Sequence, residues 1–264
     1  MSEACTYTAD EMMTVMASRL LIDGQVCFVG IGLPSAAANL AVRLHAPALH
    51  LIYESGTIDT RPRVLPLSIG DGDLAETATA IVSLPEVFAY WLQAGRVDVG
   101  FLGAAQVDRF GNLNSTVIGP YDRPTTRLPG GGGAPDIALH AKQVLVVLKQ
   151  SPRSFVARLD FRSSPGFLGG SGERARLRVG GLGPAALVSD YGVFKPSVDT
   201  QELELVARYP GVEVESIVNA TGWPLRVAAH VEVVSAPTVE ELQVLRDLQQ
   251  LTREAHSRPI RLPI

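Results

Sequence analysis

The sequence predicts an α/β fold with an open, mainly parallel sheet flanked by helices, and two observations predict it. The apolar runs at residues 142–148 and 185–189 are continuous, which is typical of strands covered on both faces. Segments with helical periodicity alternate with such runs along the chain, as in a sheet built from strand–helix–strand units. We therefore expect a single domain, residues 1–264, in which residues 257–264 form a flexible tail or dock on a partner.

The first elements follow from local signals. Thr8 and Glu11 have the spacing of a capping box, and the residues after them predict an amphipathic helix to about Ile22. A turn at 23–24 follows. The segment QVCFVGIG then predicts a buried strand and a glycine-containing bend, and the next helix starts near Pro34.

The middle of the chain continues the alternation. Leu49–Tyr53 predicts a short strand that runs into a polar turn. Residues 85–93 predict a helix with Tyr90 and Trp91 in the core, and residues 97–102 predict the next strand.

Later segments include both helices and loops. Helices are expected at 213–220 and 238–256. The Gly/Pro-rich stretches at 127–138 and 163–184 interrupt the pattern, and we expect them to be long functional loops within the domain.

Composition excludes several classes of protein. The chain has 264 residues, of which 46% are hydrophobic, so it has enough apolar material for a folded core. Lys and Arg total 23 against 27 Asp and Glu, a net charge of −4, with no basic stripe for a nucleic-acid backbone. No apolar run approaches the roughly 18 residues of a membrane span. We expect neither nucleic acid nor membrane as a partner.

The cysteines, histidines and N-terminal residues add three expectations. Cys5 and Cys27 are too few for a disulfide framework or a four-ligand zinc site. The five histidines lack metal-ligand spacing, so no metal site is expected. The first residues lack the pattern of a signal peptide, and a reducing cytoplasm is the expected location.

Candidate functional residues follow three of the predicted strands. Ligands of open α/β sheets bind beyond the carboxyl ends of the strands, where small residues let a ligand approach backbone N–H groups. The residues at these ends are Gly30 and Gly32 after the first strand, Glu54 and Ser55 after the second, and Gly103 and Gln106 after the strand at 97–102.

Glu54 is the most informative single residue. An acid directly after a buried strand lies at the boundary between the sheet and the crevice, where desolvation makes a carboxylate reactive. We interpret it as a candidate nucleophile. The alternative is an ordinary exposed acid, or an ion-pair partner of Arg61 or Arg63.

Two further segments allow a functional and a structural interpretation. The run from Gly130 to Gly133 can present N–H donors to a ligand, or it can be a flexible surface loop. The segment VDRFGN predicts a hairpin turning at Gly111-Asn112, whereas Gln106 and Asn114 can instead project amide groups into the crevice. No serine lies in a GxSxG context, which disfavours a serine hydrolase.

Several long motifs resemble one family. They are YESG at 53–56, LPLSIGDGDLAETA at 65–78, GFLGAAQVDRFGNLNSTVIGPY at 100–121, RLPGGGGAPDIA at 127–138 and TGW ending at Trp223. Together these motifs resemble the β subunit of family I CoA-transferases, in particular the glutaconate type. The resemblance extends from about residue 6 to residue 256. One departure is the GGGG run, because relatives usually carry a non-glycine residue at its second position.

The resemblance implies a ping-pong reaction at Glu54. It implies that Glu54 attacks an acyl-CoA thioester and then carries CoA as a glutamyl thioester. The implied reaction moves CoA from succinyl-CoA to 3-oxoadipate, a step of the β-ketoadipate pathway of aromatic catabolism. Glutaconate or another dicarboxylate is the alternative acceptor. CoA is then a substrate, and no permanently bound cofactor is expected.

The resemblance also implies a partner and further site residues. A CoA-transferase α subunit is expected, in a heterotetramer or larger assembly. The residues expected to bind CoA or the oxyanion are Gly30, Gly32, Ser55, Gly103, Gln106, Gly132 and Gly133.

Two other functional classes remain open. A CoA-thioester hydrolase or decarboxylase on the same fold is one, although relatives with those activities lack the glutamate. The other class is a structural subunit whose partner carries the catalytic residues. This interpretation predicts that replacing Glu54 leaves activity intact.

Overall fold

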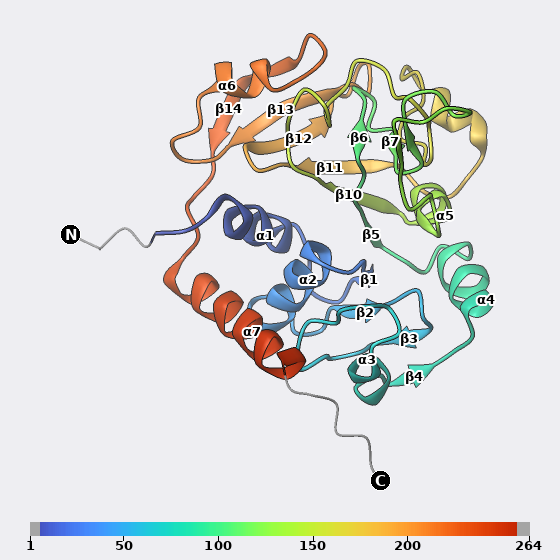
Figure 1. The fold of residues 1–264 in the computed structure, drawn as a ribbon, viewed down its shortest axis with the longest axis vertical. Helices are drawn as coiled ribbons and strands as arrows, with labels where there is room; N and C mark the ends of the chain where they lie inside the picture. Colours follow the sequence, from blue (N-terminus) through green and yellow to red (C-terminus); the bar gives the residue numbers. More distant parts are fainter. Residues whose placement is uncertain (1–5, 258–264) are drawn as a thin grey trace.

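The computed structural model describes residues 6–257, and its main feature is a mixed sheet with a parallel centre (Figure 1). Of the tail expected at 257–264, Ser257 is the last residue of a helix, whereas residues 258–264 lie outside the described residues, as does Cys5. In spatial order the strands of this sheet are β14 (Arg226–Val233), β13 (Leu203–Arg208), β12 (Gly192–Pro196), β11 (Pro184–Val188), β10 (Gln143–Val147), β5 (Val99–Leu102), β1 (Val26–Phe28), β2 (His50–Ile52), β3 (Thr57–Ile58) and β4 (Ala80–Ile81).

Strand direction divides this sheet into a centre and two flanks. The strands β11, β10, β5, β1 and β2 are parallel neighbours, which confirms the expected fold class. The pairings of β11 with β12, β12 with β13, β2 with β3 and β3 with β4 are antiparallel. Two short antiparallel pairs stand apart: β6 (Gln106–Val107) with β7 (Leu113–Asn114), and β8 (Val117–Ile118) with β9 (Thr126–Arg127).

Helices cover both faces of the sheet. On one side lie α1 (Ala9–Arg19), α2 (Leu33–Leu44) and α7 (Val239–Ser257), and on the other lie α4 (Leu84–Glu86), the π-helix η1 (Val87–Leu92) and α5 (Ala134–His140) (Figure 1). The remaining helices are α3 (Gly72–Glu76), the 3-10 helix η2 (Glu173–Leu177) and α6 (Val214–Asn219).

Most predicted helices and strands lie where the local signals put them. The Thr8–Glu11 capping box is present, with the Glu11 amide donating to Thr8 Oγ1 at 3.1 Å and the Thr8 amide donating to Glu11 Oε2 at 2.8 Å. The first helix ends at Arg19 rather than near Ile22, because Leu20 and the turn at Gly24 already lead the chain into β1. Two ion pairs join α1 to α7, Arg19 with Glu241 at 2.7 Å and Arg246 with Glu11 at 2.6 Å.

The helix predicted at 85–93 differs in its winding. From Val87 to Leu92 it is a π-helix, and the Gln93 amide donates to Phe88 O, five residues back, at 2.8 Å. The wider turn rotates the following side chains relative to α-helical spacing. Trp91 packs against the core as expected, but Tyr90 is 63% exposed, so its predicted burial is wrong.

Candidate active site

The carboxyl ends of four parallel strands, β2, β1, β5 and β10, meet at one edge of the sheet. Phe28 pairs with Ile52 on one side and with Gly100 on the other. Continuing this register by two residues places Gly30 beside Glu54 and Leu102. The predicted strand-end residues therefore lie along one edge.

Glu54 lies in a tight turn between β2 and β3. The Gly56 amide donates to Tyr53 O at 3.0 Å, and the Tyr53 amide donates to Thr57 O at 3.1 Å. Gly56 has a φ of +103°, and a Cβ there would overlap the carbonyl oxygen of Val82. Glycine is therefore required at this position, and the turn has little freedom to vary.

The Glu54 carboxylate faces η1 and the start of α5. Its Oε1 lies 3.0 Å from the point that a Cβ on Gly133 would occupy, and Phe88 Cζ lies 2.6 Å from the same point. The structure thus brings Glu54 and Gly133 together, although 79 positions separate them in the chain. Phe88 supplies an apolar wall beside the carboxylate.

Glu54 has no ionic partner in the part of the chain that the structure describes, and it makes no hydrogen bond there. Arg61 pairs with Asp59 at 3.2 Å, and Arg63 pairs with Asp73 at 2.8 Å. The alternative interpretation of Glu54 as the partner of either arginine is therefore wrong. Its two oxygens remain free to react.

The glycine-rich run forms the connection into α5. Gly132 has a φ of +51°, and Gly133 is the N-cap of the helix. The Gly130 amide donates to Ser115 O at 2.8 Å, which anchors the start of the run. Within residues 6–257, the amides of Gly132 and Gly133 donate to no other group. These N–H groups are thus unpaired among the described residues, and Gly133 is the one that lies beside the Glu54 carboxylate.

A cavity of about 710 Å³ opens at the same edge on the side of α1, α2 and α7, and Gly30, Gly32 and Gly103 line it. A Cβ on Gly30 would approach nothing closer than Pro34 Cγ at 3.8 Å, and one on Gly103 only Val147 O at 3.5 Å. Neither glycine has a positive φ. Packing and backbone conformation therefore do not require glycine at these two positions, and its effect is to leave open volume.

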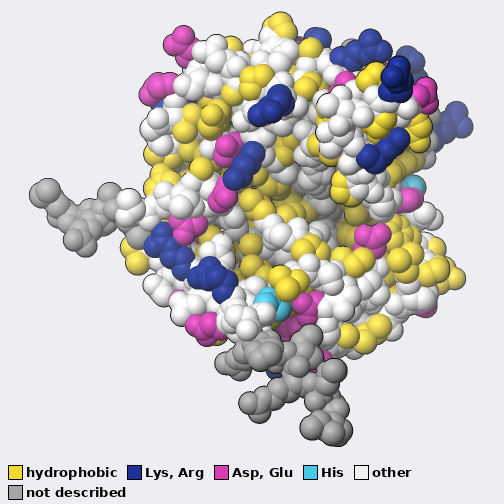
Figure 2. Space-filling model, in the orientation of Figure 1, with side chains coloured by type: hydrophobic (Ala, Val, Ile, Leu, Met, Phe, Trp, Pro, Cys, Tyr) yellow, Lys and Arg dark blue, Asp and Glu magenta, His cyan; other side chains and the backbone are white. Residues whose placement is uncertain are grey.

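The position of this cavity fits the topology of the sheet. After β1 the chain passes through α2 to β2 on one side, whereas β5 lies on the other side of β1. Such a reversal of strand order produces a crevice where α/β proteins bind ligands. Its walls are mainly apolar, and Lys149 and Asp10, which form an ion pair at 2.8 Å, also line it. Figure 2 shows hydrophobic side chains gathered in a hollow toward the middle of the face in view.

The predicted site residues thus form two groups along this edge, on opposite faces of the sheet. Gly30, Gly32 and Gly103 line the cavity, whereas Gly133 faces the Glu54 carboxylate. Ser55 is partly buried, and its Oγ has no partner among the described residues.

Gln106 is held inside the predicted hairpin. Its Nε2 donates to Asp160 at 2.9 Å, and its Oε1 accepts from Asn114 at 2.7 Å, so the amide does not project freely into the crevice. The hairpin itself is confirmed. Its turn is centred on 109–110 rather than on Gly111-Asn112, because the Gly111 amide donates to the Asp108 carbonyl oxygen at 3.0 Å.

Sequence reasoning missed three features of this edge. Phe88 gave no signal, because one aromatic residue in an amphipathic helix is ordinary core material. The Asp10–Lys149 ion pair joins the first helix to the end of β10, and no spacing rule detects it. The buried contact of Tyr53 with Ser35 was also missed, although both hydroxyls lie at otherwise apolar positions.

The described residues contain neither a metal-binding cluster of side chains nor a membrane-spanning helix. Residues 6–257 contain no cluster of three or more His, Cys, Asp or Glu side chains arranged to hold a metal ion. None of the helices in that range is long and apolar enough to cross a membrane.

Known proteins resemble this chain over most of its length. Residues 10–220 match a family model described as coenzyme A transferase. The chain is 54% identical over 250 residues to the B subunit of 3-oxoadipate CoA-transferase from Pseudomonas knackmussii, covering 95% of this chain and 96% of that protein. It is 36% identical over 255 residues to the B subunit of glutaconate CoA-transferase from Acidaminococcus fermentans, covering 94% of each.

A solved structure shows the same fold. The crystal structure of glutaconate coenzyme A-transferase from Acidaminococcus fermentans superposes with a TM-score of 0.87 at 33% identity, covering 93% of this chain and 95% of that one.

Proposed function

This chain belongs to the coenzyme A transferase family, as the counterpart of its B subunits, and we propose that it moves CoA from succinyl-CoA to 3-oxoadipate. CoA is then a substrate, and the covalent carrier is Glu54. An α subunit is the proposed partner, because the relatives at 54% and 36% identity are both named as the B subunit of a CoA-transferase.

The observation that carries the proposal is the environment of Glu54. Its carboxylate stands at the carboxyl edge of the sheet without a partner among the described residues, beside the glycine run. A carboxylate is a weak nucleophile in water, and an ion pair would weaken it further. An unpaired carboxylate against an apolar wall is suited to attack a thioester.

The first half-reaction consists of two exchanges at carbonyl carbons. A Glu54 oxygen attacks the thioester carbon of succinyl-CoA, the C–S bond breaks, and CoA leaves as the thiolate with an acyl-glutamyl anhydride behind. The thiolate then attacks the Glu54 side-chain carbonyl carbon, and the anhydride C–O bond breaks to release succinate. Glu54 now carries CoA as a thioester.

The second half-reaction runs the same steps in reverse. The carboxylate of 3-oxoadipate attacks the glutamyl thioester and expels the CoA thiolate, which forms a second anhydride. The thiolate then attacks the acyl carbonyl of that anhydride. 3-Oxoadipyl-CoA leaves, and the Glu54 carboxylate is restored without net consumption of water.

The glycine residues take two roles in this proposal. The free amides of Gly132 and Gly133 bind the oxyanion that develops during each attack, because fixed donors stabilise such charge best. The cavity lined by Gly30, Gly32 and Gly103 accommodates the chain of the CoA thioester, since its walls are mainly apolar and its glycines leave room.

Acceptor choice rests on the comparisons. The higher identity to the 3-oxoadipate enzyme, 54% against 36%, favours 3-oxoadipate over glutaconate. Initial rates with each acid as acceptor test this choice directly. A kcat/KM for glutaconate at or above that for 3-oxoadipate would assign the chain to the glutaconate type.

Mass spectrometry of the covalent intermediate tests the mechanism. The complex with the α subunit is incubated with succinyl-CoA and no acceptor, and peptides that contain residues 53–56 are mapped before and after borohydride treatment. We expect a CoA adduct on Glu54 that borohydride removes. Glu54→Ala abolishes the adduct and lowers activity by several orders of magnitude, whereas Glu240→Gln, at an exposed position on α7, leaves both unchanged.

Other outcomes point to the other functional classes. Free CoA that accumulates with no adduct indicates a thioester hydrolase. Full activity of the Glu54→Ala complex indicates that the partner subunit supplies the catalytic residues.

A further inference from the structure

We propose that Tyr53 is a positioning residue, which fixes the Glu54 carboxylate through a chain of polar contacts along α2 that is buried at Tyr53, Ser35 and Asn39 and reaches the surface at Arg43. The inference rests on the proposed function, because it takes Glu54 as the group that forms the covalent bond. It adds a role for four residues outside the reacting site: Tyr53, Ser35, Asn39 and Arg43.

Tyr53 controls the Glu54 turn through its backbone. Its carbonyl accepts from the Gly56 amide and its amide donates to the Thr57 carbonyl, so both polar backbone groups of Tyr53 close the turn. On the other side of the turn, Gly56 lies directly against the carbonyl oxygen of Val82. A small rotation of Tyr53 therefore redirects the Glu54 side chain.

The ring of Tyr53 is anchored at its far end to α2. Its hydroxyl lies 2.7 Å from Ser35 Oγ, and both residues are fully buried. Burial raises the pKa of Tyr53 to about 12, so the hydroxyl keeps its proton at neutral pH. The contact fixes the ring along its length, from the turn to the helix.

The anchor continues along one face of α2. Asn39, one turn after Ser35, donates from Nδ2 to Ser35 O at 3.0 Å. Arg43, one turn further, donates to Asn39 Oδ1 at 3.1 Å. Ser35, Asn39 and Arg43 are four positions apart and share one helix face, so the contacts form a continuous chain.

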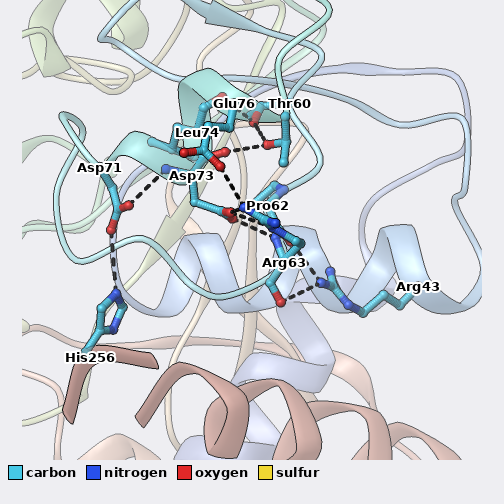
Figure 3. Close-up of polar contacts among 10 residues, drawn as sticks. Arg43, Thr60, Pro62, Arg63, Asp71, Asp73, Leu74, Glu76 and His256 are labelled. Atoms are coloured by element: carbon cyan, nitrogen blue, oxygen red, sulfur yellow. Dashed lines mark hydrogen bonds and ion pairs between the residues drawn. The ribbon is translucent and has the colours of Figure 1, made fainter. Parts of the chain in front are cut away.

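The far end of this chain is fixed to the segment after β3 (Figure 3). Arg43 donates to the carbonyl oxygen of Pro62 at 2.9 Å, and the neighbouring Arg63 forms ion pairs with Asp73 and Glu76, both at 2.8 Å. Tyr53 is thereby tied to a network that spans α2, the segment at 62–63 and α3.

Stability alone does not explain a hydroxyl in this place. Tyr53 packs in the core cluster with Leu51, Ala37 and Leu74, where a phenylalanine ring would fill the same space. Burying two hydroxyls carries a desolvation cost that their mutual hydrogen bond only offsets. What the pair adds is a fixed orientation of the residue that closes the Glu54 turn.

The chain contains a matched control for the loss of a buried hydroxyl. Tyr209 is 3% exposed and belongs to the same core cluster, but its hydroxyl has no partner among the described residues. Tyr209→Phe therefore removes the same atom from a similar environment without breaking a network.

The test uses the complete complex with the α subunit and four variants: Tyr53→Phe, Ser35→Ala, their combination, and Tyr209→Phe. The readouts are the single-turnover rate of CoA adduct formation on Glu54, kcat, KM for succinyl-CoA, and Tm. We expect Tyr53→Phe and Ser35→Ala each to lower the adduct rate and kcat about tenfold with KM unchanged, because misplacement slows the chemical step. The combination loses no more than either alone, and Tyr209→Phe loses nothing.

The combined variant separates positioning from stability. Each single variant takes from one buried hydroxyl the 2.7 Å hydrogen bond of the pair and lowers Tm, whereas removal of both partners restores much of it. We expect the adduct rate to stay low in the combined variant although its Tm recovers.

Two results would overturn the inference while leaving the proposed function intact: an adduct rate in Tyr53→Phe equal to that of the wild type, or a rate that recovers with Tm in the combined variant. Absence of an adduct on Glu54 in the wild-type complex would instead overturn both the proposed function and this inference.

Discussion

Adding one methyl group at Gly133 tests whether the Glu54 carboxylate reacts where the structure places it. Gly133 has a φ of −78° and a ψ of −6°, so alanine fits the backbone without strain. The new Cβ would lie 2.6 Å from Phe88 Cζ and 3.0 Å from Glu54 Oε1. Carbon atoms pack at about 3.5–4.0 Å, so the ring or the carboxylate must move by roughly 1 Å.

The magnitude follows from that displacement. A shift of about 1 Å at a reacting group costs about 100-fold in rate, which corresponds to about 2.7 kcal/mol of transition-state stabilisation. Overpacking costs about 1–3 kcal/mol of folding free energy. We therefore expect Gly133→Ala to remain folded, with Tm lowered by a few degrees and kcat lowered about 100-fold.

The assay is steady-state CoA transfer by the complex, together with thermal denaturation. Gly180→Ala is the control, because a Cβ there meets nothing within 4 Å and its φ is not positive. Combining Gly133→Ala with Phe88→Leu relieves the contact with the ring and should recover part of kcat. A Gly133→Ala complex with kcat within threefold of the wild type would refute the placement of Gly133 at the reacting carboxylate.

Three further predictions concern the fold around the site. Gly56→Ala, with its Cβ against the Val82 carbonyl at a φ of +103°, is expected to destabilise the chain by about 3 kcal/mol or more, and an unchanged Tm would contradict the close approach of Gly56 to Val82. The hydrogen bond from Arg246 holds the pKa of Glu11 below its ordinary value of 4.5, so its stabilisation is present at neutral pH and is lost as the pH falls below that value. Glu11→Gln should lower stability by about 1 kcal/mol at pH 7, with the difference from the wild type shrinking toward pH 3 in denaturation curves; a constant difference would be inconsistent with this linkage. Cys27 is fully buried and burial raises the pKa of its thiol, so peptide mapping should find it unlabelled by iodoacetamide in the native complex and labelled in urea, whereas rapid native labelling would show an open core.

Elements encoded by local signals could be predicted from the sequence. The Thr8–Glu11 capping box and the continuous apolar runs of β10 and β11 depend on neighbouring residues alone, and the structure has them at those positions. The flank formed by β12, β13 and β14, in which β13 and β14 pair parallel, was not predicted, although β13 alternates strictly between buried and partly buried residues. Its partner β14 is an edge strand with mostly exposed side chains, so it carries no such hydrophobic pattern.

The candidate site could be predicted only in part, because its contacts are long-range. Glu54 stood out by its place after a strand, but its approach to Gly133 depends on how α5 packs, which no spacing rule describes. Gln106 illustrates the opposite error. Its position after β5 suggested a free amide, whereas the structure uses that amide inside the hairpin with Asp160 and Asn114. A polar residue near a strand end serves either the ligand or the local fold, and only the tertiary contacts decide between them.

Two opposing requirements apply to Glu54, and different residues of the structure meet them. A nucleophilic carboxylate must be held in place, yet a cation or hydrogen-bond donor on its own oxygens would stabilise the charge and reduce its reactivity. In this structure the contacts that hold the turn all belong to its neighbours: Gly56 is confined by the Val82 carbonyl, and Tyr53 is anchored to Ser35 on α2. The position of the carboxylate is thus fixed through the backbone, and both of its oxygens stay available. The same division explains why the polar network lies beneath the turn, on the side of the sheet opposite the face that Glu54 presents to Phe88 and Gly133.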